Sequence, residues 1–365
     1  MKNTFGNNIT LTIFGESHGV SVGCVLDGMP AGIPIDYGYI NKLLSLRRPS
    51  GAISTARSEE DAFEIHSGVF NGYTTGTPIC IIIPNKDTRS SDYKSISDLA
   101  RPSHADYTAH IKYRGYEDPR GGGHFSGRIT AALVAAGGII IPALNRKGIK
   151  IGTHIASCAG VNDREFNDVE KDIEALFDLS FAVLDNEKAK AMQENILKAK
   201  ESLDSVGGIL ETAITGVEAG VGEPWFDTLE GILSHALFSI PAIKGVEFGA
   251  GFKFAEMRGS EANDQFRCVS GKVITATNNS GGINGGITNG MPIVFRTAIK
   301  PTPTIFKAQE TVDFRAMTDA VLQPKGRHDP AIVHRARVVQ DAAAAIVLCD
   351  ALALRYGTDW LRGER

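Results

Sequence analysis

The chain has 365 residues, 42% hydrophobic and 22% charged, as is usual for a globular protein. Its net charge of −4 argues against non-specific binding to nucleic acid, which depends on a strongly basic surface. Five scattered cysteines without a C-x-x-C pair argue against disulfides and thiolate metal sites. No apolar stretch has the length of a signal peptide or a membrane span, so we expect a cytoplasmic protein without a membrane partner.

Apolar patterning predicts strands over residues 9–14, 20–26, 78–83 and 210–214. It predicts helices over 36–46, 126–144, 185–206, 227–238 and 336–356. Asp36 is the expected cap of the first helix, and Asp227 with Glu230 of the fourth. Helix 126–144 is almost wholly apolar, so we expect it to be buried on several faces.

A strand, a glycine-rich turn and a helix follow one another near residues 20–46 and again near 210–238. Two copies of such a unit would suit a pseudo-symmetric core. No low-complexity linker divides the chain, so we predict one large α+β domain over residues 1–365.

Glycine and arginine cluster in the loops between these elements. The 40 glycines exceed the typical share of about 7%, which favours a small-molecule site built from loops. Grouped arginines in a mildly acidic chain suit a compact anionic ligand. The loops expected to form the site are 47–60, 85–128 and 300–335.

Two of these polar segments contain a histidine that could transfer protons near neutral pH. The first is the turn Gly15-Glu16-Ser17-His18-Gly19, which is not a hydrolase nucleophile elbow because a strand should follow it. The second contains His104, which Ser103 or Asp106 could orient. A plain turn would also explain the first segment, and a helix start capped by Ser103 the second.

Two further segments could bind an anion or a cofactor. In Arg120-Gly121-Gly122-Gly123-His124-Phe125-Ser126-Gly127-Arg128, backbone amides and two arginines could hold a phosphate, or the glycines could simply lead into a helix. In the C-terminal segment, Asp329 lies among cations, either as an ion-pair partner or as a proton relay.

The nine histidines show no spacing typical of metal ligands, so we expect no metal. His66, His154 and His235 lie among apolar residues, and we expect them to be packed core residues.

Together these segments resemble, in order, the signatures of the chorismate synthase family. Further matching blocks are Arg47-Arg48-Pro49, Gly220-x-Gly222-Glu223-Pro224, Ile243-Lys244-Gly245-Val246-Glu247, Gly281-Gly282-Ile283 and Gly326-Arg327-His328-Asp329-Pro330. The resemblance implies helices sandwiched between two antiparallel sheets and a homotetramer. It also implies an anti-1,4-elimination of phosphate from 5-enolpyruvylshikimate-3-phosphate, giving chorismate with reduced FMN and without net redox.

The resemblance assigns roles to individual residues. His18 is similar to the histidine that assists departure of the phosphate, and His104 to the one that stabilises reduced flavin near its N1. Ser17 and Asp329 resemble a relay serving flavin N5, which takes the substrate proton. Residues expected to bind the substrate or its anion are Arg47, Arg48, Arg128 and Arg335. Residues expected to contact FMN are His124, Phe125, Ser126, Pro241, Ala242, Gly285, Lys300, Pro301, Thr302, Pro303, Thr304 and Arg327.

The chain departs from the family pattern at two places. Ile53 stands where many members have arginine, for which Arg57 could substitute, and His124 also stands where many have arginine. The compact length favours an external flavin reductant, with NADPH a possible source of electrons. The alternatives are an NAD(P)H-dependent flavin reductase or dehydrogenase, which would lack a dinucleotide fingerprint, and a non-enzymatic anion-binding protein.

Overall fold

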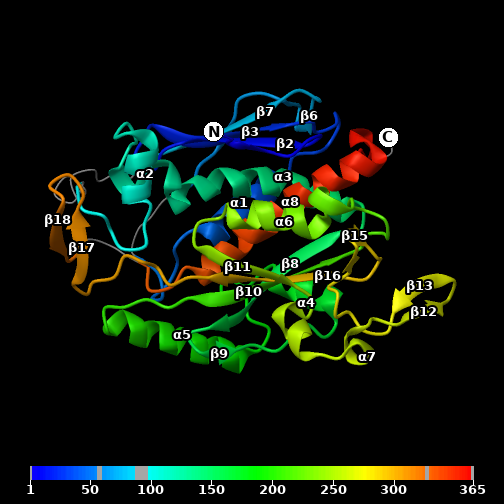
Figure 1. Ribbon diagram of the computed structural model, residues 1–365. Coiled ribbons are helices and arrows are strands. Elements are labelled where there is room, and N and C mark those ends of the chain that lie inside the picture. The colour runs from blue at the N-terminus through cyan, green and yellow to red at the C-terminus, as the bar shows by residue number, and fades with distance from the viewer. Residues whose placement is uncertain (1, 56–59, 87–97, 325–328, 363–365) are drawn as a thin grey trace.

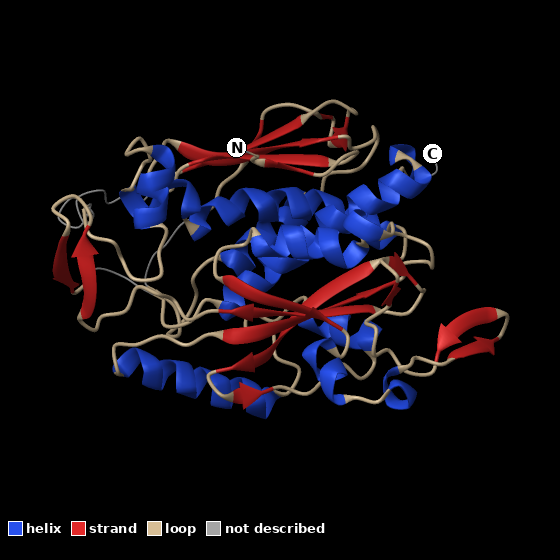
Figure 2. Ribbon diagram, in the orientation of Figure 1, coloured by secondary structure: helices blue, strands red, loops and turns tan. Residues whose placement is uncertain are grey.

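The computed structural model describes residues 2–55, 60–86, 98–324 and 329–362. Two antiparallel sheets of five strands lie on either side of a layer of helices (Figures 1 and 2). This confirms the predicted mixed architecture, with helices between two sheets. A single cluster of buried hydrophobic side chains includes residues of both sheets and of the helices between them.

The first sheet has the strand order β1-β2-β3-β7-β4. Its strands are β1 (Thr4–Phe5), β2 (Thr10–Gly15), β3 (Ser21–Asp27), β4 (Glu64–Ile65) and β7 (Ile79–Pro84). Along β7 every second residue is buried, because only one face of this sheet meets the helices. The predicted strands 9–14, 20–26 and 78–83 are therefore confirmed to within one residue at each end.

The second sheet has the order β11-β16-β10-β8-β9. Its strands are β8 (Lys150–Cys158), β9 (Val161–Asn162), β10 (Gly208–Thr215), β11 (Ile243–Phe248) and β16 (Ile293–Ile299). β3 and β10 are each the middle strand of their sheets, and each is followed by a helix of the middle layer. The two strand–turn–helix units thus occupy equivalent places, as expected for a pseudo-symmetric core.

The middle layer contains α1 (Tyr37–Arg47), α3 (Thr130–Arg146), α6 (Leu229–Phe238) and α8 (Val333–Tyr356). α3 and α8 approach so closely that a Cβ atom on Gly137 would lie 2.4 Å from that of Ala342. The segment Gly127–Arg146 has the length and hydropathy of a membrane span, but 83% of its most apolar window is buried inside the molecule. It is a core helix, as its all-round apolar sequence predicts.

Smaller elements surround these layers. The outer helices are α2 (Asp106–Tyr113), α4 (Val169–Leu176), α5 (Asn186–Glu201) and α7 (Gly259–Ala262). The two-stranded hairpins are β5–β6 (Val69–Phe70, Tyr73–Thr74), β12–β13 (Phe266–Val269, Lys272–Thr275), β14–β15 (Ile283–Asn284, Ile287–Thr288) and β17–β18 (Gln309–Asp313, Thr318–Leu322).

Several expected helix boundaries and one expected cap differ from the structure: the helix predicted over 126–144 is Thr130–Arg146, and the helix predicted over 336–356 begins at Val333. The helix predicted over 185–206 ends at Glu201, because Leu203 adopts a left-handed φ of +61° and no helix continues through that conformation. The cap of α6 is Thr228, whose hydroxyl accepts from the amide of Gly231, whereas Asp227 lies in a preceding 3₁₀ turn. Asp36 caps α1 as predicted, accepting from the amide of Tyr39 at 2.9 Å.

Candidate active site

The turn between β2 and β3 carries Ser17 and His18, and only 1% and 8% of their surfaces are exposed. The backbone amide of Ser17 donates to the carbonyl of Gly123 at 3.0 Å. The Ser17 hydroxyl is buried and has no hydrogen-bond partner among the described residues. Because a buried hydroxyl without a partner costs free energy, this group is suited to contact a bound ligand.

Three consecutive glycines of the 3₁₀ segment η2 (Arg120–Phe125) pack against this turn. Gly121 has a φ of +59°, and a Cβ atom there would lie 2.4 Å from Cδ2 of His18 and 3.0 Å from the Ser17 hydroxyl. In the same segment, Nδ1 of His124 donates to the carbonyl of Gly15 at 2.7 Å. The absence of a side chain at Gly121 therefore leaves the space that the His18 imidazole occupies. The sequence alone did not indicate this role for the glycines.

Arg47 and Arg128 flank one buried carboxylate, that of Asp61. Nη2 of Arg47 lies 3.0 Å from Asp61, and Nη1 of Arg128 bonds its other oxygen. Burial alone would raise the pKa of Asp61, but the two guanidiniums together hold it below its usual value. Burial lowers the pKa of Arg47. Asp61 thus holds the two guanidiniums side by side.

Neither Arg48 nor Ile53 is fully exposed to solvent. Arg48 is half-buried and its backbone ends α1. Ile53 is buried in the hydrophobic core, so its position does not offer a charge to the site. Arg57 and Arg327 lie outside the described residues.

Asp329, just before α8, and His334, in the first turn of α8, hold the residues that follow Ile53. Asp329 accepts from the backbone amide of Thr55 at 2.9 Å and from Nη2 of Arg335 at 2.7 Å. The hydroxyl of Ser54 lies 2.8 Å from Nε2 of His334. Burial, with the charge of Arg335 in support, lowers the pKa of His334 to about 3. His334 is therefore neutral at any physiological pH.

Asp329 is thus an ion-pair partner, one of the two alternatives that its sequence context left open. Ser17 makes no hydrogen bond to it in the described part of the chain, since the serine hydroxyl has no partner there. Arg335 is close enough to Arg47 for its charge to lower the pKa of that residue. The C-terminal segment therefore lies beside the arginine cluster.

His104 lies on the loop that precedes α2, and its Nε2 is 2.6 Å from the hydroxyl of Thr304. The expectation that Ser103 or Asp106 orients His104 is wrong, because Asp106 forms a bidentate pair with Arg101. The alternative cap is wrong as well, since α2 begins after Ala105 without a side-chain cap. The orienting hydroxyl comes from a segment 200 residues away in the chain.

The predicted flavin-binding segment 300–304 surrounds His104. Nζ of Lys300 donates to the carbonyl of Ser103 at 2.6 Å, and the amide of Lys300 donates to the carbonyl of Ala242. The hydroxyl of Thr302 is buried and has no partner among the described residues. Burial, with the charge of Lys244 in support, lowers the pKa of Lys300. The structure thus brings residues 104, 242 and 300–304 together.

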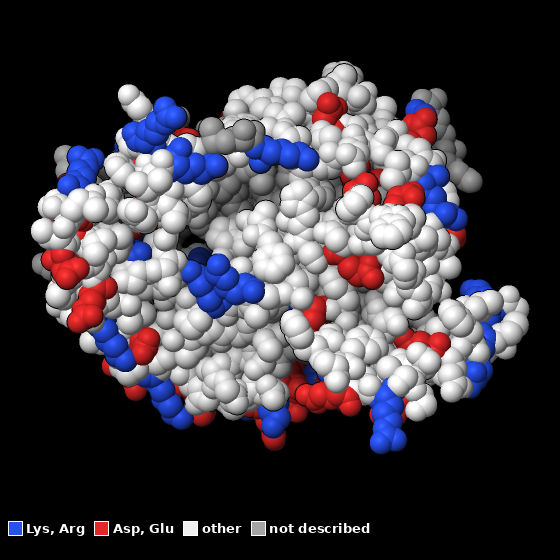
Figure 3. Space-filling model, viewed as in Figure 1, with Lys and Arg blue, Asp and Glu red and all other residues white. Residues whose placement is uncertain are grey.

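The two groups of residues are neighbours in the fold. A Cβ atom on Gly122 would lie 3.9 Å from Nη2 of Arg101, so the loops that carry His18 and His104 are neighbours. Figure 3 shows a hollow below α2 and the beginning of α3, with Lys and Arg side chains along its borders. Phe125 presents 44% of its surface on the same glycine-rich segment, and Ser126 accepts from the amide of Arg128.

Gly285 does not join this group. It forms the turn of hairpin β14–β15 beside Gly286, whose carbonyl accepts from the amide of Leu229 at the start of α6. Ala242 follows the other end of α6, which has 10 residues. A helix of that length spans about 15 Å, so one chain cannot place Gly285 against Lys300–Thr304.

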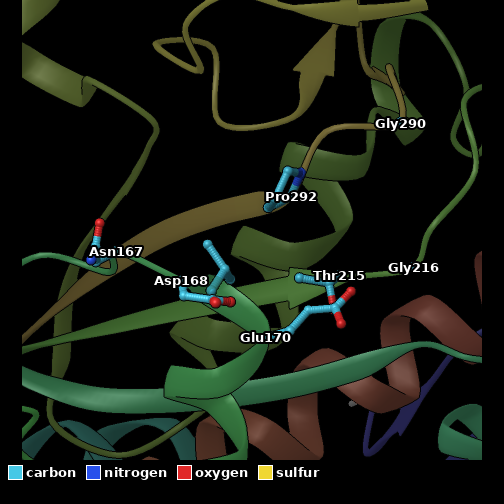
Figure 4. Close-up of a pocket in the computed structure, with 8 residues that line it drawn as sticks. Asn167, Asp168, Glu170, Thr215, Gly216, Gly290 and Pro292 are labelled. Atoms are coloured by element: carbon cyan, nitrogen blue, oxygen red, sulfur yellow. The ribbon is translucent and has the colours of Figure 1, made fainter. Parts of the chain in front are cut away.

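A separate depression lies at the start of α4, near the end of β10 (Figure 4). It is lined by Asn167, Asp168, Val169, Glu170, Thr215, Gly216, Gly290 and Pro292. None of the residues that the sequence nominated for the site belongs to it.

The three histidines expected in the core behave differently from one another. His66 and His235 are exposed, and His66 pairs with the neighbouring Glu64, so the expectation is wrong for both. His154 is buried as expected, but its two nitrogens contact carboxylates, those of Asp163 at 2.8 Å and Glu211 at 3.2 Å. Among the described residues no group of three or more His, Cys, Asp or Glu side chains could hold a metal ion.

Sequence reasoning missed two residues that organise the site, Asp61 and Asn85. The side-chain oxygen of Asn85 accepts from Nε of Arg128 at 2.9 Å. Its amide nitrogen donates to the carbonyls of Glu16 and Gly19, each at 3.0 Å. The sequence offered only weak signals for them: an acidic residue in an arginine-flanked loop and an asparagine directly after β7.

Comparison with known proteins places these features in a family. A family model described as chorismate synthase matches residues 9–353. A chorismate synthase of Pyrococcus abyssi is 47% identical over 351 residues, covering 96% of this chain and 97% of the relative. One from Dehalococcoides mccartyi is 45% identical over 360 residues, covering 98% of each chain. A solved chorismate synthase structure matches with a TM-score of 0.74 and 32% identity, over 97% of this chain and 94% of that one.

Proposed function

Because the chain belongs to the chorismate synthase family, and so is a lyase that forms chorismate in the shikimate pathway, we propose specific roles for its residues in that reaction. The proposed substrate is 5-enolpyruvylshikimate-3-phosphate and the proposed cofactor is reduced FMN. The comparisons give no support to the reductase, dehydrogenase or anion-binding alternatives. The observation that carries the proposal is that Asp61 brings the guanidiniums of Arg47 and Arg128 together, and that Asn85 connects Arg128 to the turn that carries His18.

The residues present fit a polar, planar cofactor beside His104. The buried Thr302 hydroxyl has no protein partner, Lys300 supplies a cation, and Ala242 holds a left-handed φ of +77° that exposes its backbone. Residues that would hold FMN here are His104, Pro241, Ala242, Lys300, Pro301, Thr302, Pro303 and Thr304, with His124, Phe125 and Ser126 across the hollow. We leave Gly285 out of the site of the same chain.

When bound, reduced FMN supplies at its N5 the group that accepts the proton leaving the substrate. Ser17, whose hydroxyl has no partner among the described residues, and Asp329, which pairs with Arg335, are the two residues that we propose would relay this proton. The imidazole of His104, whose Nε2 contacts the Thr304 hydroxyl, would donate a hydrogen bond to the anionic ring edge of the bound cofactor.

We propose that the arginine cluster and His18 assist the departure of phosphate. A phosphate dianion leaves readily only when its charge is neutralised by protonation or by fixed cations. Arg47, Arg128 and Arg335 lie together there, and Arg48 ends the helix beside them. His18, whose imidazole packs directly against Gly121, is the proposed proton donor to the leaving oxygen.

Three further features of the proposal concern the protein in the cell. We assign residues 1–365 to one domain that works as a homotetramer in the cytoplasm. The reducing equivalents come from an external flavin reductant, so the chain needs no dinucleotide site of its own. NADPH would then act on that reductant.

The test is an anaerobic assay with chemically reduced FMN and 5-enolpyruvylshikimate-3-phosphate. We expect phosphate release with many turnovers for each flavin and no net flavin oxidation. Oxidation of one flavin for each phosphate would contradict the proposed use of the cofactor. Rapid NAD(P)H oxidation in the absence of substrate would contradict the external reductant.

A further inference from the structure

Asn85 connects the His18 turn to the arginine cluster, and we infer that it is a positioning residue for the elimination. It follows β7 directly, and its backbone amide donates to the carbonyl of Val20. Its side chain then spans the gap between the turn and Arg128 with three hydrogen bonds of 2.9 to 3.0 Å.

The orientation of the Asn85 amide follows from its partners. Nε of Arg128 can only donate, so it must meet the side-chain oxygen. The carbonyls of Glu16 and Gly19 can only accept, so they must meet the NH₂ group. Both amide hydrogens are therefore used, and no flipped arrangement satisfies the same three groups.

The two carbonyls that Asn85 holds lie on either side of Ser17 and His18. The amide of Gly19 also donates to the carbonyl of Glu16 at 3.1 Å, so the turn is a closed ring of backbone bonds with Asn85 across its open side. Gly121 limits the imidazole of His18 from the opposite direction. Removing Asn85 would leave the turn supported on one side only.

Arg128 is fixed at its other end by Asp61, which also holds Arg47. A continuous chain of contacts therefore runs from Arg47 through Asp61, Arg128 and Asn85 to the turn. This chain sets how far the proton donor lies from the cations that bind the phosphate. The inference rests on the proposed role of His18 and adds that Asn85 fixes its distance from the anion site.

Only an asparagine side chain of this length offers one acceptor and two donors here. In Asn85→Asp the contact with Arg128 survives, but two carbonyls now face a carboxylate and the turn loses its support. In Asn85→Ala both connections are lost. The turn connection carries the effect on turnover, so the two variants should lose kcat to the same extent.

The matched control is Asn195→Asp on α5. Asn195 also donates from its amide to a backbone carbonyl, that of Ala159, and accepts from a cation, Nζ of Lys198, but these partners lie beside β9 and on α5, not in the turn of residues 16–19. Its variant changes the same chemistry without touching the turn, so its kcat and KM should equal those of the wild type.

The experiment measures anaerobic phosphate release by the flavin-loaded enzyme. We expect kcat to fall roughly 10- to 100-fold in Asn85→Ala and Asn85→Asp, as small misplacements of catalytic groups do. In a His18→Ala background, Asn85→Ala should lower kcat by less than about twofold more, because the residue acts through His18. Wild-type kcat in the Asn85 variants, or full additivity with His18→Ala, overturns the inference.

A second readout does not depend on catalysis. Hydrogen exchange of the segment 15–22 should become faster in Asn85→Ala, while exchange in α5 stays unchanged. If exchange becomes faster in Asn85→Ala but the His18→Ala variant keeps wild-type turnover, the proposed role of His18 is refuted. Asn85 then supports the turn without acting on the elimination. Unchanged exchange at the turn refutes the positioning role itself.

Discussion

Two buried charge clusters lie in opposite parts of the molecule, and they are balanced differently. Near the hollow, Arg47 and Arg128 share the single carboxylate of Asp61. Across the second sheet, His154 and Arg296 are surrounded by three carboxylates, those of Asp163, Glu211 and Glu247. In the first cluster one carboxylate joins two guanidiniums, whereas in the second three carboxylates contact one imidazole and one guanidinium.

The second cluster is a ladder across neighbouring strands. His154 on β8 faces Glu211 on β10, Glu211 faces Arg296 on β16, and Arg296 faces Glu247 on β11. The remaining donors of Arg296 reach the carbonyl of Gly249 at 2.7 Å. A ladder so fully paired needs no ligand and serves the sheet. The candidate site, by contrast, contains the Ser17 and Thr302 hydroxyls, which have no hydrogen-bond partner among the described residues. Incomplete pairing thus distinguishes the binding region from the scaffold.

The largest effect should come from the histidines of the hollow. His18→Ala and His104→Ala should each lower turnover by about 10²–10⁴-fold, the usual contribution of general acid–base groups. Thermal unfolding should stay close to that of the wild type, because neither residue belongs to the hydrophobic core. Phosphate release under anaerobic conditions measures the first point and circular dichroism the second. Full activity in both variants would remove them from the mechanism.

Asp61→Asn should test the difference in balance directly. It leaves two buried guanidiniums without their shared anion, and loss of one partner of a buried ion pair costs about 3–5 kcal/mol of stability. Inorganic phosphate should restore part of this loss by binding between the arginines.

The matching variant in the ladder is Glu211→Gln. It should also destabilise the protein, but phosphate should restore nothing there, since Glu247 and Asp163 remain close by. The melting temperatures of both variants, measured with and without phosphate, show which variant phosphate stabilises. Equal rescue of both variants would show that the two clusters do not differ as we describe.

Gly121→Ala should distinguish the effect of a strained backbone at a left-handed φ from the effect of a side chain that collides with His18. A Cβ atom there would displace His18, so we expect roughly a 10- to 100-fold loss of kcat, in line with the effect of small misplacements. Gly160→Ala is the control: its φ of +80° is also left-handed, but a Cβ atom would meet open space. Both should lose some stability, and only the first should lose turnover. Equal kcat in the two would mean that Gly121 matters for its backbone alone.

The smallest expected effect is a pH dependence from the ladder. Burial alone would lower the pKa of His154, but its bonds to Asp163 and Glu211 raise it above 6.5. A raised folded pKa gives stability that is complete below the unfolded value and is lost as pH rises through the folded one. The free energy of unfolding should therefore decline above about pH 6.5. In His154→Gln that part of the slope should vanish, as urea unfolding at several pH values would reveal.

The sequence predicts the scaffold better than it predicts the supporting residues of the site. Apolar alternation located β2, β3 and β7, because each strand buries one face and so carries a repeating pattern. His18 and His104 stand in polar loops whose composition is itself a signal. Asp61 and Asn85 act only through partners from other segments, and such contacts leave no local pattern. His66 and His235 show the same limit, since apolar neighbours in sequence did not make them neighbours of the core.

α8 lies at the centre of the helical layer and carries Arg335, the partner of Asp329, in its first turn, yet it follows both sheets in the chain. A ribosome releases the first sheet, the glycine-rich segment and α3 long before the helix that they must enclose. We expect the nascent chain to expose the apolar face of α3 until α8 has been synthesised, and to need chaperones during that interval. The same order offers a practical use: a chain divided before α8 should be inactive, and activity should return only when the missing helix is supplied.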